Sequence, residues 1–312
     1  MKTSNRKTKD PKKAKRLRAV TVTSALAVVA VLSFIFSARL IELKALIGLE
    51  SVYEKARHSD VSVFFPDVGS AGCALVHTPS RDILIDCGNT KAQYSILDTL
   101  EMLGTDKLDL AVLTHPDSDH IGDFKEVAEN YRIDTFLTCE YTKYSSSEMY
   151  GELFKTLTDK NIPVTYAAAG DVYAFDELSV EVISPASLYK TSNDNSVVLR
   201  LSCGDFSALF TGDISKKAER DILARGADIS ADLLYTAHHG SSGSSSAEFL
   251  KAVSPKYAVI SVEEDKYHPS DAALDRLMNE GCEILRTDIS GMIAVYYLDN
   301  SIEFTEAKNY RD

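Results

Sequence analysis

The chain has 312 residues, of which 45% are hydrophobic and 26% charged, and its formal net charge is −12. Residues 1–18 hold nine Lys or Arg against one Asp, a local charge of +8, so the remainder of the chain carries −20. A body this acidic repels polyanions, which argues against generic affinity for nucleic acids or anionic membranes unless a local basic groove overrides the net charge.

The basic tail at 1–18 is followed by an apolar segment. Residues 19–38 carry no charge and are long enough to cross the hydrocarbon core of a bilayer. We therefore expect a transmembrane anchor at 19–40, with the tail in the cytoplasm and the rest of the chain outside it, because positive charge stays inside. A cleaved signal peptide, which would release a secreted form, is the alternative, but Phe36 lies where a small residue is needed.

The remainder is expected to form a connector at 41–60 and one domain at 61–312, large enough for a substantial core. Apolar, β-rich runs predict strands at 61–65, 74–78, 83–86, 108–114, 133–138, 172–175, 178–184, 196–202, 206–211, 233–237, 257–262, 284–286, 292–297 and 302–304. Helical patterns occur at 91–103, 121–130, 146–160, 215–225, 246–253 and 270–280. Clustered strands mixed with single helices indicate an α/β (α+β) fold of two sheets packed face to face with helices outside. The five scattered cysteines include no CxxC pair, which favours buried free thiols.

The loop between the strand at 108–114 and the helix at 121–130 is dense in metal-capable side chains. Four of its six residues qualify: His115, Asp117, Asp119 and His120. Imidazoles mixed with carboxylates suit zinc, manganese or iron better than calcium. The alternative is a solvated polar loop whose Asp residues cap the following helix.

Three further segments follow expected strands and are able to converge on this loop. Asp213 ends Phe210-Thr-Gly-Asp, where a carboxylate either bridges two ions or forms a turn. His238 and His239 precede Gly240, and paired imidazoles at such a place are uncommon as core filling. His268 precedes a proline after the strand at 257–262, and a single loop histidine is as often structural as functional.

These motifs, in this order, resemble those of the metallo-β-lactamase superfamily: Asp86-Cys-Gly, His115-Pro-Asp-Ser-Asp-His120, Thr211-Gly-Asp213 and His238-His239. Four stretches further resemble the hydrolase domain of ComEC competence proteins: Phe65-Pro-Asp-Val-Gly69, Asn193 to Leu201, His238 to Ser246 and Ser254 to Ser261. The resemblance covers about residues 61–297. It implies an αββα sandwich with a metal site at one edge of the sheets.

The resemblance also implies a divalent cofactor, zinc or manganese, as one or two ions. Its expected ligands are His115, Asp117, Asp119, His120, Asp213 and His238. The first two would hold one ion, the next two the other, and Asp213 would bridge them. His238 would complete the second ion's shell, although the sequence does not decide between His238 and His268 for that position.

Other residues receive roles around the metal by the same resemblance. The catalytic candidates are Asp119, which would orient the attacking water, and His239 and His268, as spare ligands, proton donors or phosphate contacts. The candidates for orienting the metal loop or binding substrate oxygens are Asp86, Asn195 and Ser241. Asp86 would act through hydrogen bonds to the histidine loop.

Departures from the superfamily pattern affect the expected substrate. Asp117 stands where a second histidine is usual, and no histidine lies between His120 and His238. The first ion site is therefore poor in nitrogen, which favours harder ions such as manganese or makes the site weak. Cleavage of β-lactams is accordingly not expected.

The sequence as a whole predicts a membrane-anchored, metal-dependent hydrolase with its domain outside the cytoplasm, a phosphodiesterase or nuclease acting on DNA or nucleotides. The net charge of −20 on the body favours a small or metal-chelated substrate over long DNA. Two alternatives remain: a hydrolase of small esters or amides, and a non-catalytic member that binds a ligand or envelope partner. The sequence names no protein partner.

Overall fold

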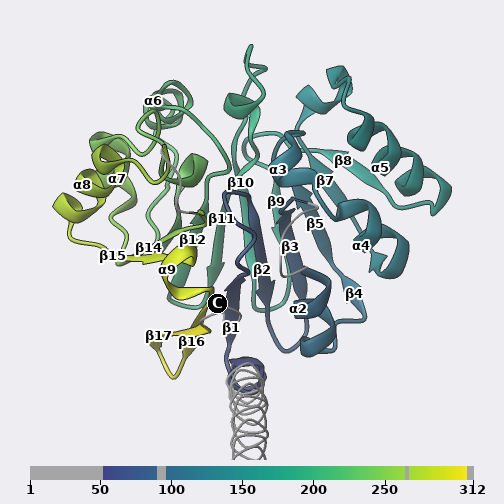
Figure 1. The fold of residues 1–312 in the computed structure, drawn as a ribbon, viewed down its shortest axis with the longest axis horizontal. Coiled ribbons are helices and arrows are strands. Elements are labelled where there is room, and N and C mark those ends of the chain that lie inside the picture. The colour runs from purple at the N-terminus through teal and green to yellow at the C-terminus, as the bar shows by residue number, and fades with distance from the viewer. Residues whose placement is uncertain (1–51, 90–95, 264–266, 308–312) are drawn as a thin grey trace, which may run out of the picture. The chain divides into compact units, whose positions relative to one another are not determined.

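The computed structural model describes residues 52–89, 96–263 and 267–307 (Figure 1). The expected tail, the anchor at 19–40 and the first part of the connector lie outside these residues. Among the helices that the structure does describe, none has the length and apolar character needed to cross a membrane.

Two large β-sheets form the centre of the domain. The first has the strand order β17-β16-β1-β2-β3-β5-β7-β8, with β1 (Val61–Phe65), β2 (Cys73–His77), β3 (Asp82–Cys87), β5 (Leu110–Leu113), β7 (Phe136–Thr138), β8 (Val164–Tyr166), β16 (Met292–Leu298) and β17 (Ser301–Ala307). The second has the order β15-β14-β13-β12-β11-β10-β9, with β9 (Val172–Ala174), β10 (Ser179–Ser184), β11 (Val198–Cys203), β12 (Phe206–Phe210), β13 (Leu233–Tyr235), β14 (Tyr257–Ile260) and β15 (Glu283–Arg286). A small third sheet pairs β4 (Lys107–Leu108) with β6 (Arg132–Ile133).

Helices cover the outer face of each large sheet (Figure 1). The first sheet carries α2 (Ile96–Leu103), α3 (Ser118–Ile121), α4 (Phe124–Asn130) and α5 (Glu148–Asp159). The second sheet carries α6 (Lys216–Ala224), α7 (Ala247–Val253) and α8 (Asp271–Glu280). Shorter segments complete the chain: α9 (Thr287–Ser290) and the 3-10 turns η1 (Glu140–Tyr144), η2 (Asn193–Asn195) and η3 (Ala237–Gly240).

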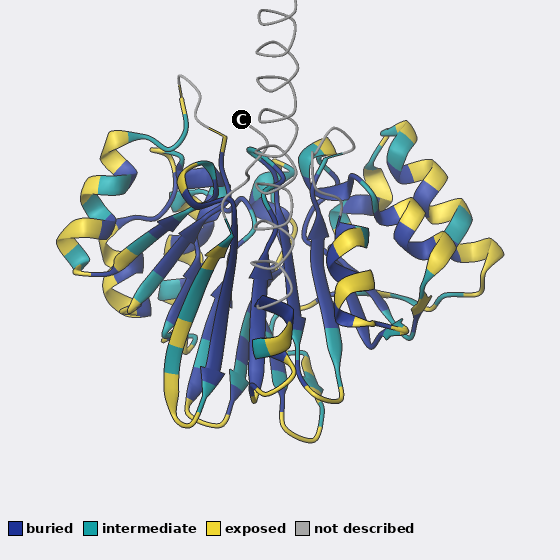
Figure 2. Ribbon diagram, turned by 60° about the horizontal axis from the view of Figure 1, so that its bottom comes forward, coloured by how far each residue is buried: buried dark blue, intermediate teal, exposed yellow. Residues whose placement is uncertain are grey.

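Alternation along the strands sorts the side chains into hydrophobic layers. In β1, Val63 and Phe65 point into the core between the sheets, whereas Phe64 packs under the helices of the first sheet. Successive side chains of a strand point to opposite faces, so one strand serves both layers. Leu199 and Tyr235 reach the inter-sheet core from the second sheet. Figure 2 shows the burial along the strands and the exposed outer sides of the helices. The expected arrangement of two face-to-face sheets with helices outside is confirmed.

Parallel pairing brings several strand ends to the same edge of the sandwich. Strands β3, β5 and β7 run parallel in the first sheet, and β12, β13 and β14 run parallel in the second. The segments that leave the carboxyl ends of β5, β12 and β13 carry the histidines and aspartates singled out in the sequence. Topology therefore gathers residues that are more than a hundred positions apart in the chain.

The structure differs locally from the expected elements. The single strand expected at 108–114 is divided, because Lys107–Leu108 pairs with β6 while the following residues pair with β3 and β7. The helix expected at 121–130 is split into α3 and α4 around Gly122. A Cβ on Gly122 would lie 2.3 Å from the carbonyl oxygen of Gly88, so only glycine permits this close approach.

The end of the connector belongs to the folded domain. Residues 52–56 are helical, and the Tyr53 ring stacks on Phe64 with their centroids 5.5 Å apart. The Tyr296 hydroxyl donates a hydrogen bond to the carbonyl oxygen of Val52 at 3.0 Å. The domain thus begins before Val61.

All five cysteines are buried and free, as the sequence predicted.

Candidate metal centre

Two short turns present the central residues of the site. Asp119 and His120 lie in α3, directly after β5, and His239 lies in η3, directly after β13. Asp213 follows Gly212 at the end of β12. Gly212 has φ +51, and a Cβ there would lie 2.7 Å from that of Ser196, so the turn that presents Asp213 requires glycine.

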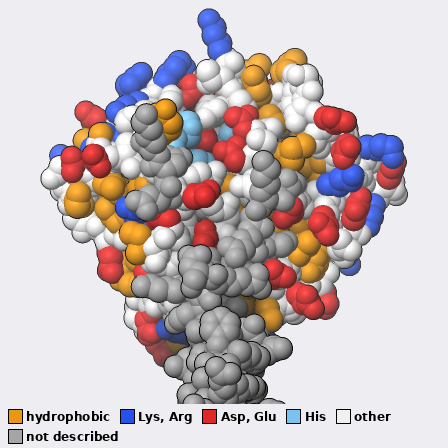
Figure 3. All heavy atoms as spheres, viewed as in Figure 1, with side chains coloured by type: hydrophobic (Ala, Val, Ile, Leu, Met, Phe, Trp, Pro, Cys, Tyr) orange, Lys and Arg blue, Asp and Glu red, His pale blue; other side chains and the backbone are white. Residues whose placement is uncertain are grey.

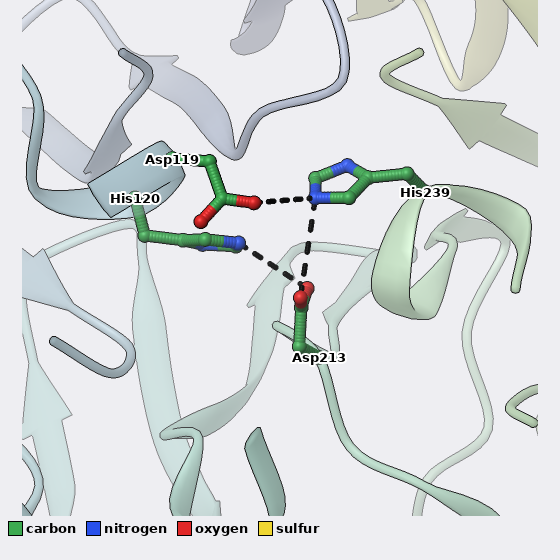
Figure 4. Close-up of side chains that lie close together, drawn as sticks. All are labelled: Asp119, His120, Asp213 and His239. Atoms are coloured by element: carbon green, nitrogen blue, oxygen red, sulfur yellow. Dashed lines mark ion pairs between the residues drawn. The ribbon is translucent and has the colours of Figure 1, made fainter. Parts of the chain in front are cut away.

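Four side chains form a tight cluster: Asp119, His120, Asp213 and His239 (Figure 4). Each offers one ligand atom, and these atoms all lie within 4.8 Å of one another. His120 Nε2 is 3.3 Å from Asp213 Oδ1, and His239 Nε2 is 3.5 Å from Asp119 Oδ2. His239 Nε2 also lies 3.9 Å from Asp213 Oδ2, so the four groups face a common point.

Three buried imidazole nitrogens lack a hydrogen-bond partner within the described residues: Nε2 of His115, His120 and His239. Each lies within 3.9 Å of an Asp213 oxygen. Leaving such a nitrogen buried and unpaired costs free energy that a bound ion recovers. Imidazole nitrogens converging on carboxylates are the donor set of zinc and of manganese, so these residues fit a divalent ion.

Hydrogen bonds on the far side of each ring orient the ligand nitrogens. His120 Nδ1 lies 2.7 Å from Asp86 Oδ2, and His239 Nδ1 lies 2.9 Å from the carbonyl oxygen of Ser261. Since both partners are acceptors, each Nδ1 donates its proton to its partner, which leaves Nε2 as the ring atom directed towards the centre. Asp86 also accepts hydrogen bonds from the backbone N–H and the hydroxyl of Thr114.

The electrostatics of the site keep its carboxylates ionised. Burial alone would raise the pKa of Asp213, but His120 and His239 hold that pKa well below its ordinary value. Burial likewise opposes ionisation of Asp119, yet the adjacent His239 and the charge of His120 lower its pKa to about 2. Both carboxylates therefore offer anionic oxygens at neutral pH.

The pKa values of His120 and His115 are shifted in opposite directions. For His120, burial would lower the pKa, but Asp213 and Asp86 raise it well above the usual value. For His115, burial and the neighbouring His120 lower the pKa, so this imidazole is neutral and available as a ligand.

A second set of ligands meets the other side of Asp213. Asp213 Oδ2 lies 3.9 Å from His115 Nε2 and 3.8 Å from His238 Nε2. Asp117 Oδ2 is 3.7 Å from His115 Nε2, and the Ser192 hydroxyl donates to Asp117 Oδ1 at 2.7 Å. Asp213 Oδ1 faces His120, while Oδ2 faces this set and also His239, so the carboxylate contacts both groups of ligands.

A family model described as the metallo-beta-lactamase superfamily matches residues 66–263. The chain belongs to this superfamily of metal-dependent hydrolases. It is similar to ComE operon protein 3 of Bacillus subtilis, with 28% identity over 77% of this chain and 33% of that protein. It is also 32% identical to the competence protein ComA of Neisseria gonorrhoeae, over 77% of this chain and 33% of ComA. The chain spans about a third of the length of these relatives.

A solved structure shows the same fold at much lower identity. CmlA, a diiron β-hydroxylase from Streptomyces venezuelae, aligns with a TM-score of 0.50 and 12% identity, over 80% of this chain and 54% of CmlA. At that identity the likeness concerns the fold alone. The superfamily fold of two sandwiched sheets, expected from the motifs, is thereby shown.

The two adjacent histidines of this superfamily member take positions that differ from those expected. The sequence assigned the second ion's last ligand to His238 and kept His239 as a spare, but His239 is the one beside Asp119. His238 instead stacks on His268 with ring centroids 5.8 Å apart, at the more exposed side of the site. Both residues have φ +51, and this left-handed turn sends the two rings in different directions.

Asn195 and Ser241, which were expected to contact substrate oxygens, both form hydrogen bonds within the protein. The Asn195 side chain is fully buried, and its amide bonds the backbone of Tyr189 and Thr191. Its polar atoms are thus used to shape the loop before β11, in place of the expected substrate contact. Ser241 is half-buried, and its hydroxyl accepts a hydrogen bond from the Gly243 N–H at 3.2 Å.

Ser196, which was not predicted from the sequence, also supports the metal centre. Its hydroxyl accepts a hydrogen bond from the Asp213 N–H at 3.0 Å and lies 3.3 Å from His115 Nδ1. A serine at a strand start gives no signal of this kind by residue type alone. Figure 3 shows histidine side chains on the molecular surface beside side chains of Asp or Glu.

Proposed function

We propose that the chain is a membrane-anchored hydrolase that uses zinc or manganese to cleave phosphodiesters outside the cytoplasm. The observation that carries this proposal is the convergence of three unpartnered, buried imidazole nitrogens on the two oxygens of Asp213. Burying these nitrogens without hydrogen-bond partners costs free energy, and the arrangement is well suited to binding one or two ions.

Two groups of residues would hold the ions. Asp119, His120, Asp213 and His239 form one set, and His115, Asp117, Asp213 and His238 form the other. Divalent ions in these positions supply Lewis acidity and lower the pKa of water towards neutrality. The second set has only one buried imidazole, His115, because the His238 side chain is 36% exposed, and its Asp117 side chain is 41% exposed as well. We therefore expect the second ion to bind more weakly.

The protein's own groups provide the remaining steps. Asp119, ionised and beside His239, accepts a hydrogen bond from the attacking water and orients it towards phosphorus. The stacked imidazoles of His238 and His268 lie at the open side of the site. His268, which holds no ion in this proposal, donates a proton to the leaving oxygen, as general acid catalysis requires.

The substrate class is proposed from the relatives and from charge. The similar proteins are named for competence and recombination, which favours a phosphodiester of a nucleic acid or nucleotide. The net charge of −20 on the chain after residue 18 disfavours long polyanions, so we propose short or metal-chelated phosphodiesters as the better substrates. Residues 19–38 are the proposed anchor.

The proposal is tested with the full chain in detergent, loaded with Mn²⁺ or Zn²⁺. Bis(p-nitrophenyl) phosphate, p-nitrophenyl acetate and a short single-stranded DNA are offered separately, beside an Asp213→Asn control. We expect cleavage of both phosphodiesters, with the DNA reaction the more sensitive to salt, and loss of both in the control. Cleavage of the acetate alone would favour the ester hydrolase. Bound metal without any cleavage would favour a non-catalytic ligand-binding protein.

A further inference from the structure

The loop that follows the histidine pair is bonded by two charged groups, the buried Glu219 and the partly exposed Arg276. Ser241–Ser246 connects η3 to α7. The Glu219 side chain from α6 is completely buried, and its carboxylate accepts hydrogen bonds from the backbone N–H groups of Ser245 and, at 2.9 Å, Ser246. A buried carboxylate used in this way fixes the backbone to which it bonds.

Arg276 from α8 donates hydrogen bonds to backbone carbonyl oxygens of the same loop. Its Nε donates to Ser245 at 2.6 Å, and its Nη2 donates to Ser244 at 2.7 Å and more weakly to Ser242 at 3.4 Å. Ser245 is therefore bound at its N–H by a carboxylate and at its carbonyl by a guanidinium. Charge-assisted bonds of this kind are roughly twice as strong as neutral ones.

The backbone is strained at three residues in this loop and in the turn before it. Ser245 has φ +52, and His238 and His239 each have φ +51, so three residues without glycine's freedom lie in the left-handed region. Each such residue costs free energy and persists only where its surroundings over-determine it. The loop needs an external restraint to keep this conformation, and Glu219 and Arg276 are the charged groups that bond its far end.

The restrained loop is also joined to the segment that carries Asp213. The Ser244 hydroxyl donates to the carbonyl oxygen of Ile214 at 2.8 Å, and the Lys216 N–H donates to that of Gly243 at 3.0 Å. At its other end the loop follows η3, which carries His239, and His239 Nε2 faces Asp119 and Asp213. A displacement of the loop would therefore move one ligand of the cluster relative to another.

From this geometry we infer that Glu219 and Arg276 are positioning residues, which hold the 241–246 loop so that His239 meets Asp119 and Asp213 at metal-binding distance. This inference rests on the proposed metal centre and extends it to two residues outside it. Outer residues that orient metal ligands change metal affinity by about 10–100-fold when they are removed. The same range is expected here, because the two side chains act on the ligand through only a few backbone bonds.

The test measures zinc affinity of the full chain by competition with a chromogenic chelator. The variants are Glu219→Gln, Arg276→Ala and Arg276→Lys. Arg200→Ala and Asp232→Asn are matched controls, because Arg200 in β11 also donates to a backbone carbonyl and Asp232, directly before β13, also accepts from a backbone N–H. Hydrogen exchange at the amides of Ser245 and Ser246 and the melting temperature without metal are recorded for each protein.

Glu219→Gln and Arg276→Ala are expected to weaken zinc binding by about tenfold or more and to speed exchange at the two amides, with Arg276→Lys in between. The controls are expected to lower the melting temperature and keep the zinc affinity of the wild type. Wild-type zinc affinity in Glu219→Gln and Arg276→Lys would overturn the inference and leave the metal centre standing. A wild-type chain that binds no zinc or manganese would overturn the proposed function, and the inference with it. If Arg276→Ala fails to fold, the two conservative variants decide the question.

Discussion

His120 Nδ1 and Asp86 Oδ2 lie 2.7 Å apart in the buried interior of the site. This bond sets which nitrogen of His120 carries the proton and turns Nε2 towards Asp213. The same carboxylate holds the backbone of Thr114 at 2.8 Å, so it fixes both the ring and the loop that precedes it.

Asp86→Asn is expected to lower the affinity for zinc by about 10–100-fold, because the amide cannot accept the Nδ1 proton and both Thr114 bonds together. Chelator competition on the folded variant measures this loss. Asp82→Asn is the matched control, since Asp82 bonds His77 Nδ1 at 2.7 Å near the opposite end of β3. Equal losses in the two variants would contradict a specific role for Asp86.

Gly72→Ala is expected to disrupt the centre without replacing any of its ligands. A Cβ at this position would lie 2.4 Å from His120 Nδ1 and 3.0 Å from Asp86 Oδ2, so the pair must separate. We expect a destabilisation of about 1–3 kcal/mol, measured by denaturant unfolding, together with weaker metal binding. Gly151→Ala in α5 has open space around it and is expected to stabilise the chain by about 1 kcal/mol.

His239→Ala and His238→Ala are expected to separate the two ion positions. His239 belongs to the four-residue cluster, so its loss should abolish tight binding of the first equivalent of zinc. His238 faces Asp213 Oδ2 from the exposed side, so its loss should weaken only the second equivalent. Isothermal titration of metal into each variant measures both steps. Loss of the first equivalent in His238→Ala alone would restore the ligand assignment made from sequence.

The stability of the domain at acid pH should depend on Asp109. Burial opposes its ionisation, but hydrogen bonds from Lys107 and Arg81, both at 2.8 Å, hold its pKa below the ordinary value. A lowered carboxyl pKa contributes stability above the unfolded pKa of about 4 and loses it as pH falls through the folded pKa. Asp109→Asn is thus expected to cost about 1–2 kcal/mol at pH 6 and almost nothing near pH 2. A cost independent of pH in urea unfolding would show that packing, not charge, is responsible.

Most of the fold was predictable from the sequence because apolar runs and their alternation specify strands locally. The run at 61–65 matches β1, and the helical pattern at 270–280 matches α8 within one residue. Such local patterns do not indicate which distant segments pair as neighbouring strands. The short strand Val164–Tyr166 was missed because its side chains are only partly buried, so its sequence lacks a strong apolar signal.

The residue types of the site were predictable, but their arrangement was only partly so. Spacing and order identified the loop at 115–120, Asp213 and the histidine pair. Which of the two histidines meets Asp119 depends on consecutive left-handed backbone angles, which residue types alone do not reveal. Supporting groups such as Ser196, Glu219 and Arg276 act through contacts between distant elements, so no local pattern marks them.

The central claim is that Asp119, His120, Asp213 and His239 form a divalent metal site. Its most direct test is the metal content, by elemental analysis, of the full chain purified without a metal-binding tag, beside the Asp119→Ala plus His120→Ala double variant. We expect about one or two equivalents of zinc or manganese per wild-type chain and a loss of that metal in the folded double variant. Equal metal content in both proteins, or none in the wild type even after reloading, would contradict it.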